Sequence, residues 1–121
     1  MEAALARLNR AADEVLLISL HDRHGDYIAS YEYPGSRGAI EMRYRALIAI
    51  ALAHHAHRLL LIHNHPSSDA TPSTTDIAAT AGLVALCRPL ELTVHDHLVV
   101  GGGAVVSMRR AGLIPSQGIC A

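Results

Sequence analysis

The chain has 121 residues, of which 50% are hydrophobic and 17% charged, a composition typical of one compact domain and not of a disordered chain. Its formal net charge is −1, so a nucleic-acid partner is possible only through a local patch and is not supported by the overall charge. There is no secretory signal, no stretch long enough to span a membrane and no CxxC motif, so we expect a single domain over residues 1–121, cytoplasmic and without a membrane partner.

The first third of the chain predicts a helix followed by a β-hairpin. Residues 2–13 place apolar side chains at helical spacing. Residues 15–20 and 27–32 have the composition of strands, and the segment between them has the composition of a turn. Glu32 ends the second strand. It is either an ordinary exposed glutamate or a carboxylate carried to the interior or the end of the sheet.

The next segment predicts a helix from about Glu41, after a loop at 34–38. Its expected buried face consists of Met42, Leu47, Ile48, Ala51 and Leu52. The helix ends near three close histidines, His54, His55 and His57. They could suggest a metal site, but histidine at a helix C-terminus is favoured by the helix dipole, and we prefer that interpretation.

An apolar run at 59–62 predicts a buried strand that leads into His63 and His65. Side chains two residues apart in a strand point the same way, with Cβ atoms roughly 6.5–7 Å apart, so these two imidazoles can converge on one ion. Pro66 cannot donate to a sheet ladder and ends the strand. The helix before this run and the strands on either side predict a βαβ-like unit.

A loop-forming segment, residues 67–72, leads to Ser73 and Asp76. Ser-x-x-Asp fits a capping box, which by itself would assign Asp76 to the helix N-terminus, and Thr71-Pro72 offers another helix start. Together with the two histidines, however, Asp76 completes three ligands for a tetrahedral divalent ion such as Zn²⁺ and leaves the fourth position open. We therefore expect a zinc site at His63, His65 and Asp76.

The last third predicts a helix at 77–86, a strand at 91–100, a glycine turn at 101–103 and a strand at 104–108, with a loose tail from about 112. His95-Asp96-His97 repeats the HxH pattern but has no acid at a workable spacing downstream. We expect Asp96 and His97 to support the metal site through hydrogen bonds instead. Cys120, in the tail, is expected to be exposed and inert.

His63-x-His65, seven residues, Ser73, two residues and Asp76 match without a gap the signature of the JAMM (MPN-plus, or JAB) metalloprotease superfamily. Residues 63–67, 71–73 and 96–101 further resemble its RadC-like branch, and the resemblance extends from about Val15 onward. One departure is Ser68, where the branch usually has glycine.

This resemblance implies an α/β domain of the cytidine-deaminase-like JAMM/MPN fold, with a mixed β-sheet flanked by helices. It also implies a zinc-dependent hydrolase of peptide or isopeptide bonds that acts on a peptide or protein substrate. Glu32 would be the catalytic base, with Glu41 as the second choice, and Ser73 would donate to the anionic oxygen formed during hydrolysis. The alternative is a RadC-like module for DNA repair or scaffolding, with a structural or vestigial metal site.

Overall fold

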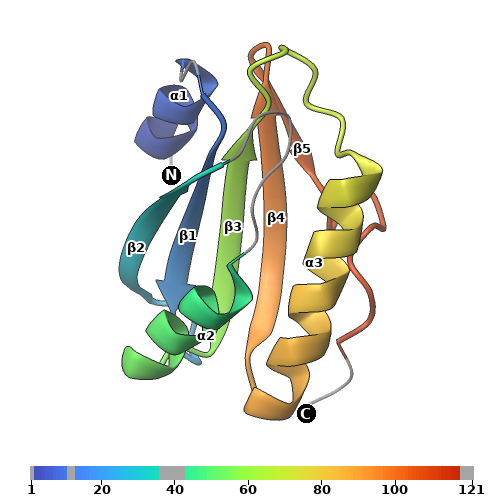
Figure 1. Ribbon diagram of the computed structural model, residues 1–121. Helices are drawn as coiled ribbons and strands as arrows, with labels where there is room; N and C mark the ends of the chain where they lie inside the picture. Colours follow the sequence, from blue (N-terminus) through green and yellow to red (C-terminus); the bar gives the residue numbers. More distant parts are fainter. Residues whose placement is uncertain (1, 11–12, 36–42, 118–121) are drawn as a thin grey trace.

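The computed structural model of the protein describes residues 2–10, 13–35 and 43–117. Its elements are α1 (Glu2–Arg10), β1 (Val15–His21), β2 (Tyr27–Pro34), α2 (Tyr44–Ala53), β3 (Arg58–Asn64), α3 (Thr74–Cys87), the short 3₁₀ helix η1 (Arg88–Leu90), β4 (Thr93–Gly101) and β5 (Ala104–Ser107). The strands form one mixed sheet in the order β2-β1-β3-β4-β5, in which β3 and β4 are parallel and the other neighbours antiparallel (Figure 1).

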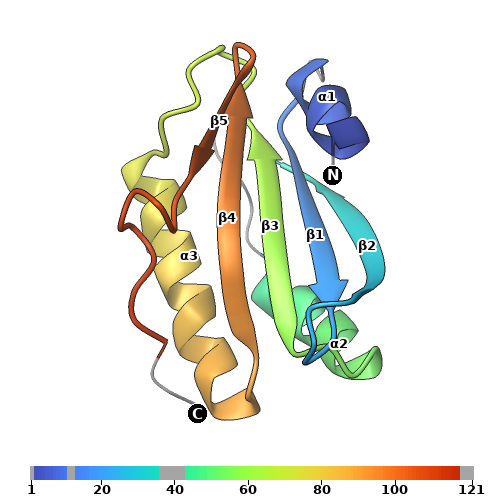
Figure 2. The same cartoon turned by 180° about the vertical axis from the view of Figure 1, so that it is seen from behind.

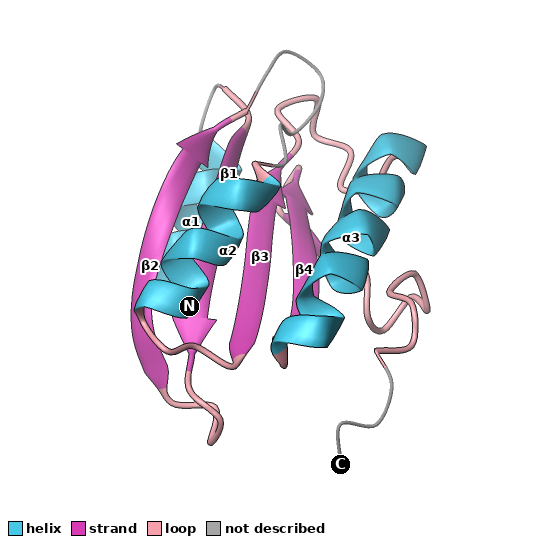
Figure 3. Ribbon diagram, turned by 60° about the horizontal axis from the view of Figure 1, so that its bottom comes forward, coloured by secondary structure: helices cyan, strands magenta, loops and turns pink. Residues whose placement is uncertain are grey.

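Helices cover both faces of this sheet. α2 and α3 lie on one face and α1 lies on the other, near one end of the sheet (Figures 2 and 3). Alternate residues of β3 face the two layers: Leu59 and Leu61 pack with α2 and α3, whereas Leu60 and Ile62 belong to the cluster under α1. The strand is therefore apolar throughout because both of its faces are buried.

α3 begins with the capping box that the sequence predicts. Ser73 is the N-cap, its side chain accepts a hydrogen bond from the Asp76 amide, and the Asp76 side chain accepts one from the Ser73 amide. Thr71-Pro72 is therefore not the helix start. The α-helix ends at Cys87 and passes directly into η1, where Arg88 still has a helical conformation and Pro89 has no N–H to continue the α-helical hydrogen bonds.

The predicted α/β fold and the mixed sheet flanked by helices are confirmed. The prediction for the buried face of α2 was partly wrong, because Leu52 is 47% exposed, whereas Leu47 and Ala51 are buried as expected. Met42 and Cys120 lie outside the described residues. Part of the expected loose tail is held by specific contacts, since the Gln117 amide hydrogen-bonds both the N–H and the C=O of Val94 at 2.7 Å.

The sheet brings three chain segments to one edge. Leu16, near the start of β1, pairs with His63 at the end of β3. Because β4 is parallel to β3, its last residues reach the same edge, and α3 begins beside them (Figure 1). Side chains far apart in the sequence therefore meet there. None of the described helices has the length and apolar character needed to cross a membrane.

Candidate metal centre

His63 and His65 lie at this edge with their rings side by side. The His63 side chain, on the face covered by α2 and α3, has no exposed surface. His65 follows the last residue of β3, and its amide donates to the Val100 carbonyl at 2.7 Å. The two Nε2 atoms are 3.0 Å apart, and the ring centroids are separated by 4.8 Å. The predicted convergence of the two imidazoles is therefore present.

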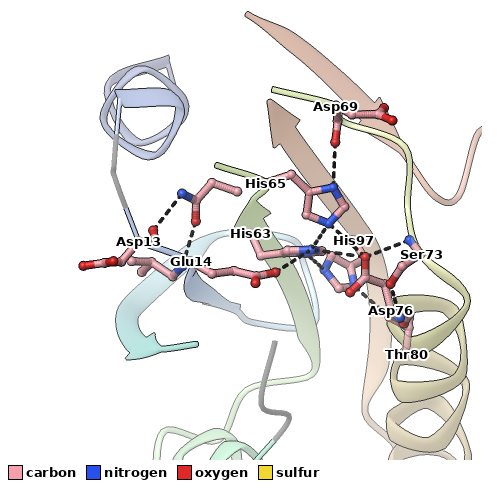
Figure 4. A network of polar contacts seen from close by, with 11 residues as sticks. Asp13, Glu14, His63, His65, Asp69, Ser73, Asp76, Thr80 and His97 are labelled. Carbon is pink, nitrogen blue, oxygen red and sulfur yellow. Dashed lines mark hydrogen bonds and ion pairs between the residues drawn. The ribbon is translucent and has the colours of Figure 1, made fainter. Parts of the chain in front are cut away.

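The orientation of His65 is set by the loop that follows it. Its Nδ1 lies 2.7 Å from the carbonyl oxygen of Asp69, and a carbonyl can only accept, so Nδ1 carries the hydrogen (Figure 4). The Nε2 of the neutral ring is then left with a lone pair that faces His63. Ser68, in this loop, has a φ of +73°, a conformation that favours the glycine usual in the RadC-like branch.

Asp76 belongs to both the helix cap and the histidine pair. Its Oδ2 accepts from the Ser73 amide at 2.9 Å and lies 3.0 Å from His65 Nε2 and 3.4 Å from His63 Nε2. Burial alone would raise the pKa of Asp76, but the contacts with His63 and the Ser73 amide hold it well below its ordinary value. The two interpretations of Asp76, as a helix-capping residue and as a metal ligand, are therefore compatible.

A second carboxylate, Glu14, completes the cluster. One oxygen of Glu14 lies 3.7 Å from His63 Nε2, and one potential ligand atom from each of Glu14, His63, His65 and Asp76 lies within 4.8 Å of the other three. Glu14 is only 7% exposed. Burial raises the pKa of its carboxyl, although the two imidazoles oppose the rise.

Asn64, between the two histidines, holds the segment that carries Glu14. Its side chain points to the opposite face of the sheet, where Oδ1 accepts from the Val15 amide at 2.7 Å and Nδ2 donates to the Asp13 carbonyl at 2.9 Å. The Glu14 carbonyl also accepts from Gly35 at 2.8 Å. The backbone on both sides of Glu14 is thus tied to β3, so its side chain is directed toward His63 (Figure 4).

The structure does not bring Glu32 to this cluster. Glu32 lies on β2 opposite Leu17, its side chain is 40% exposed, and it forms an ion pair with Arg7. β2 is separated from β3 by β1, so the carboxylate that reaches the histidines comes from the start of β1. The sequence shows Glu14 only as an acid directly before the first strand, and it does not show that this strand pairs with the HxH strand. Glu41 lies outside the described residues.

The donor atoms fit a tetrahedral zinc ion. Ligands at the usual Zn–N and Zn–O distances of about 2.0–2.1 Å lie roughly 3.3–3.4 Å from one another. The three separations among the His63, His65 and Asp76 donor atoms are 3.0, 3.0 and 3.4 Å. In addition, Asp76 Oδ1 is buried without a hydrogen-bond partner among the described residues. A small cation among these atoms would compensate the buried charge of Asp76.

Fold and site together define an α/β domain with a buried cluster of two imidazoles and two carboxylates that could hold a metal ion. A family model described as "RadC-like JAB domain" matches residues 1–113, which is nearly the whole chain. The chain belongs to the RadC-like JAB domain family, as the resemblance of its motifs predicted.

Proteins named UPF0758 are among its relatives. The chain is 40% identical over 96 residues to a UPF0758 protein of Ruegeria pomeroyi, an alignment that covers 77% of this chain and 42% of the relative. A UPF0758 protein of Rhodobacter capsulatus is 38% identical, with 90% of this chain and 51% of the relative covered. One from Chloroflexus aggregans is 40% identical over 67% of this chain and 35% of the relative. The chain thus spans about half or less of these proteins.

Proposed function

We propose that this domain is a zinc-dependent hydrolase of peptide or isopeptide bonds, with zinc held by His63, His65 and Asp76. The observation that carries the proposal is the set of distances among these three donor atoms, which fits one tetrahedral ion. Two of the three side chains are fully or almost fully buried. Three protein ligands leave a fourth position open, as catalytic zinc sites require.

Bound zinc would supply a Lewis acid that lowers the pKa of a coordinated water toward ~7. Glu14 takes the role that the family resemblance implies for Glu32. It is the carboxylate beside the donor atoms, and the raised pKa of Glu14 brings its proton affinity closer to neutral pH, which suits a group that accepts a proton and later returns it to the leaving amine.

Ser73 is proposed to stabilise negative charge on the substrate. Its Oγ accepts from the Asp76 amide at 3.0 Å, which uses a lone pair and leaves the hydroxyl hydrogen available for donation. Because this bond is part of the helix cap, the hydroxyl is held next to the proposed metal ligand. A hydrogen-bond donor fixed in this way is suited to an oxygen that becomes anionic during hydrolysis.

The substrate class rests on the resemblance to the JAMM superfamily, which implies a peptide or protein partner. Cytoplasmic action is proposed on the cysteine pattern: Cys87 is a free, buried thiol, and burial raises its pKa to about 11, which makes it unreactive.

The test has two parts. Zinc content after native purification should be one ion per chain for the wild type and should fall sharply in His63→Ala and Asp76→Ala, whereas Glu32→Gln serves as a control that retains it. A peptide library should then be cleaved by the wild type and not after treatment with a chelator. A wild type without zinc, or ligand variants with full zinc content, would contradict the proposed site, and chelator-resistant cleavage would contradict the zinc mechanism.

A further inference from the structure

A second imidazole contacts His63 from the side opposite to the metal cluster. His97, on β4, is fully buried, and its Nε2 lies 2.6 Å from His63 Nδ1. The other ring nitrogen, Nδ1, is 2.7 Å from the Thr80 hydroxyl, which in turn donates to the Asp76 carbonyl at 2.9 Å. A row of hydrogen bonds therefore runs from His63 through His97 and Thr80 to the backbone of Asp76 (Figure 4).

His97 reaches this position because of an irregularity in the pairing of β3 with β4. The register shifts between Leu59 and Leu60, so His95 has no partner in the ladder and the pairing resumes at Asp96. His95 is exposed on the other face, next to His21 and Arg58, while His97 points into the interior. The second HxH pattern is thereby divided between two environments.

Each hydrogen bond in this row contains one hydrogen, and the last acceptor of the row is fixed because it is the Asp76 carbonyl. A backbone carbonyl only accepts, so the single hydrogen of the Thr80 hydroxyl points to Asp76, a bond that helical threonine commonly makes with the carbonyl four residues earlier. The Thr80 oxygen then accepts from His97 Nδ1. His97 is fully buried and its two ring nitrogens lie against a hydroxyl and another imidazole, so the ring carries a single hydrogen, on Nδ1, and its Nε2 is an acceptor.

The same accounting determines the state of His63. Since His97 Nε2 can only accept, the hydrogen between the two rings belongs to His63 Nδ1. In the neutral ring, the form that binds a metal, the Nε2 of His63 is then left with a lone pair directed at His65 and Asp76. The reverse polarity would break the Thr80 bond to the helix carbonyl and would place a hydrogen on His63 Nε2, where it blocks metal binding.

We propose that Thr80 and His97 are positioning residues that hold His63 in the tautomer with hydrogen on Nδ1, so that Nε2 is ready to bind a metal. The hydrogen-bond partner of a metal-bound imidazole is usually a carboxylate, a backbone carbonyl or water. Here the partner is a second imidazole, whose own tautomer is set by the helix that supplies Asp76. This inference rests on the proposed function for its metal but not for its substrate.

Nitrogen-15 NMR of the histidine side chains tests the tautomers directly. In both the metal-free and the zinc-loaded protein at neutral pH, we expect His97 and His63 to carry hydrogen on Nδ1. A hydrogen on His97 Nε2 would overturn the inference. A wild type that binds no zinc would contradict the proposed function, while the tautomers of the metal-free protein would still decide this inference.

A matched pair of variants tests the consequence for the metal. Thr80→Val keeps the shape but removes the hydroxyl, so His97 should move its hydrogen to Nε2 and zinc affinity should fall about 10- to 100-fold. Thr80→Ser keeps the hydroxyl and should bind zinc within a few-fold of the wild type. Zinc affinity would be measured by chelator competition. Equal affinity of the two variants in folded protein would refute the role, and if Thr80→Val does not fold, the wild-type tautomers remain the deciding measurement.

Discussion

Replacing the buried Glu14 by glutamine should stabilise the metal-free protein at neutral pH. Because burial raises the pKa of this carboxyl in the folded state, its stabilising contribution exists only below the unfolded pKa and is lost as the pH rises through the folded value. Each unit by which the folded-state pKa is raised lowers the free energy of unfolding by about 1.4 kcal/mol at higher pH. Glutamine keeps the shape and has no charge, so the free energy of unfolding should rise at pH 7–8.

The gain should disappear below roughly pH 4, where the glutamate is protonated in both the folded and the unfolded chain. Urea unfolding of the metal-free wild type and Glu14→Gln across this pH range measures the effect. The same variant should retain zinc, because Glu14 lies outside the three proposed ligands. Its hydrolysis rate should fall about 10²- to 10⁴-fold, or about 3–5 kcal/mol in the barrier, as for the loss of a general base.

Glu32→Gln is the matched control for Glu14→Gln. It makes the same chemical change on β2, away from the cluster, where Glu32 forms an exposed ion pair with Arg7 of α1. We expect little change in its unfolding, zinc content or hydrolysis rate. If Glu14→Gln were less stable than the wild type at neutral pH and kept full activity, the reasoning about this carboxylate would be refuted. Loss of activity in Glu32→Gln alone would return the catalytic role to Glu32.

Three further predictions concern the cap, the acid limb of stability and the loop after His65. Ser73→Ala should lower the free energy of unfolding by about 1 kcal/mol while zinc is retained. Asp76→Asn should lose zinc, while its amide oxygen still accepts the hydrogen bond of the helix cap. Urea unfolding measures the first effect and chelator competition the second, and equal zinc loss in the two variants would contradict the prediction. Because the pKa of Asp76 is lowered, the metal-free wild type should be more stable than Asp76→Asn above roughly pH 4, and this difference should shrink as the pH falls further. Unfolding measured during an acid titration tests this expectation, and a difference that grows toward low pH would contradict it. Gly102→Ala should lower both the melting temperature and zinc affinity, since its added Cβ would overlap the Ser68 carbonyl oxygen. Gly103→Ala also has a positive φ, but its added Cβ would meet no atom within 4 Å, so it should affect the melting temperature less and spare zinc binding.

The Asn64 side chain shows why Glu14 escaped prediction. Its two hydrogen bonds to the backbone beside Glu14 join segments about fifty residues apart, and neither segment has a local pattern that announces the contact. The motif resemblance directed attention to a glutamate in the second strand. The choice between the two strands depends on which of them pairs with β3, and pairing between distant strands is a tertiary property.

What the sequence determined by itself was local chemistry. Strand alternation places His63 and His65 on one side, and Ser-x-x-Asp starts a helix and presents a carboxylate at its first turn, so the three proposed ligands could be named from their spacing. Only the tertiary structure decided that Glu14 joins them and that His97 and Thr80 stand behind His63. Those positions follow from strand order, from the shifted register of β4 and from the packing of α3, which depend on contacts among segments distant in the chain.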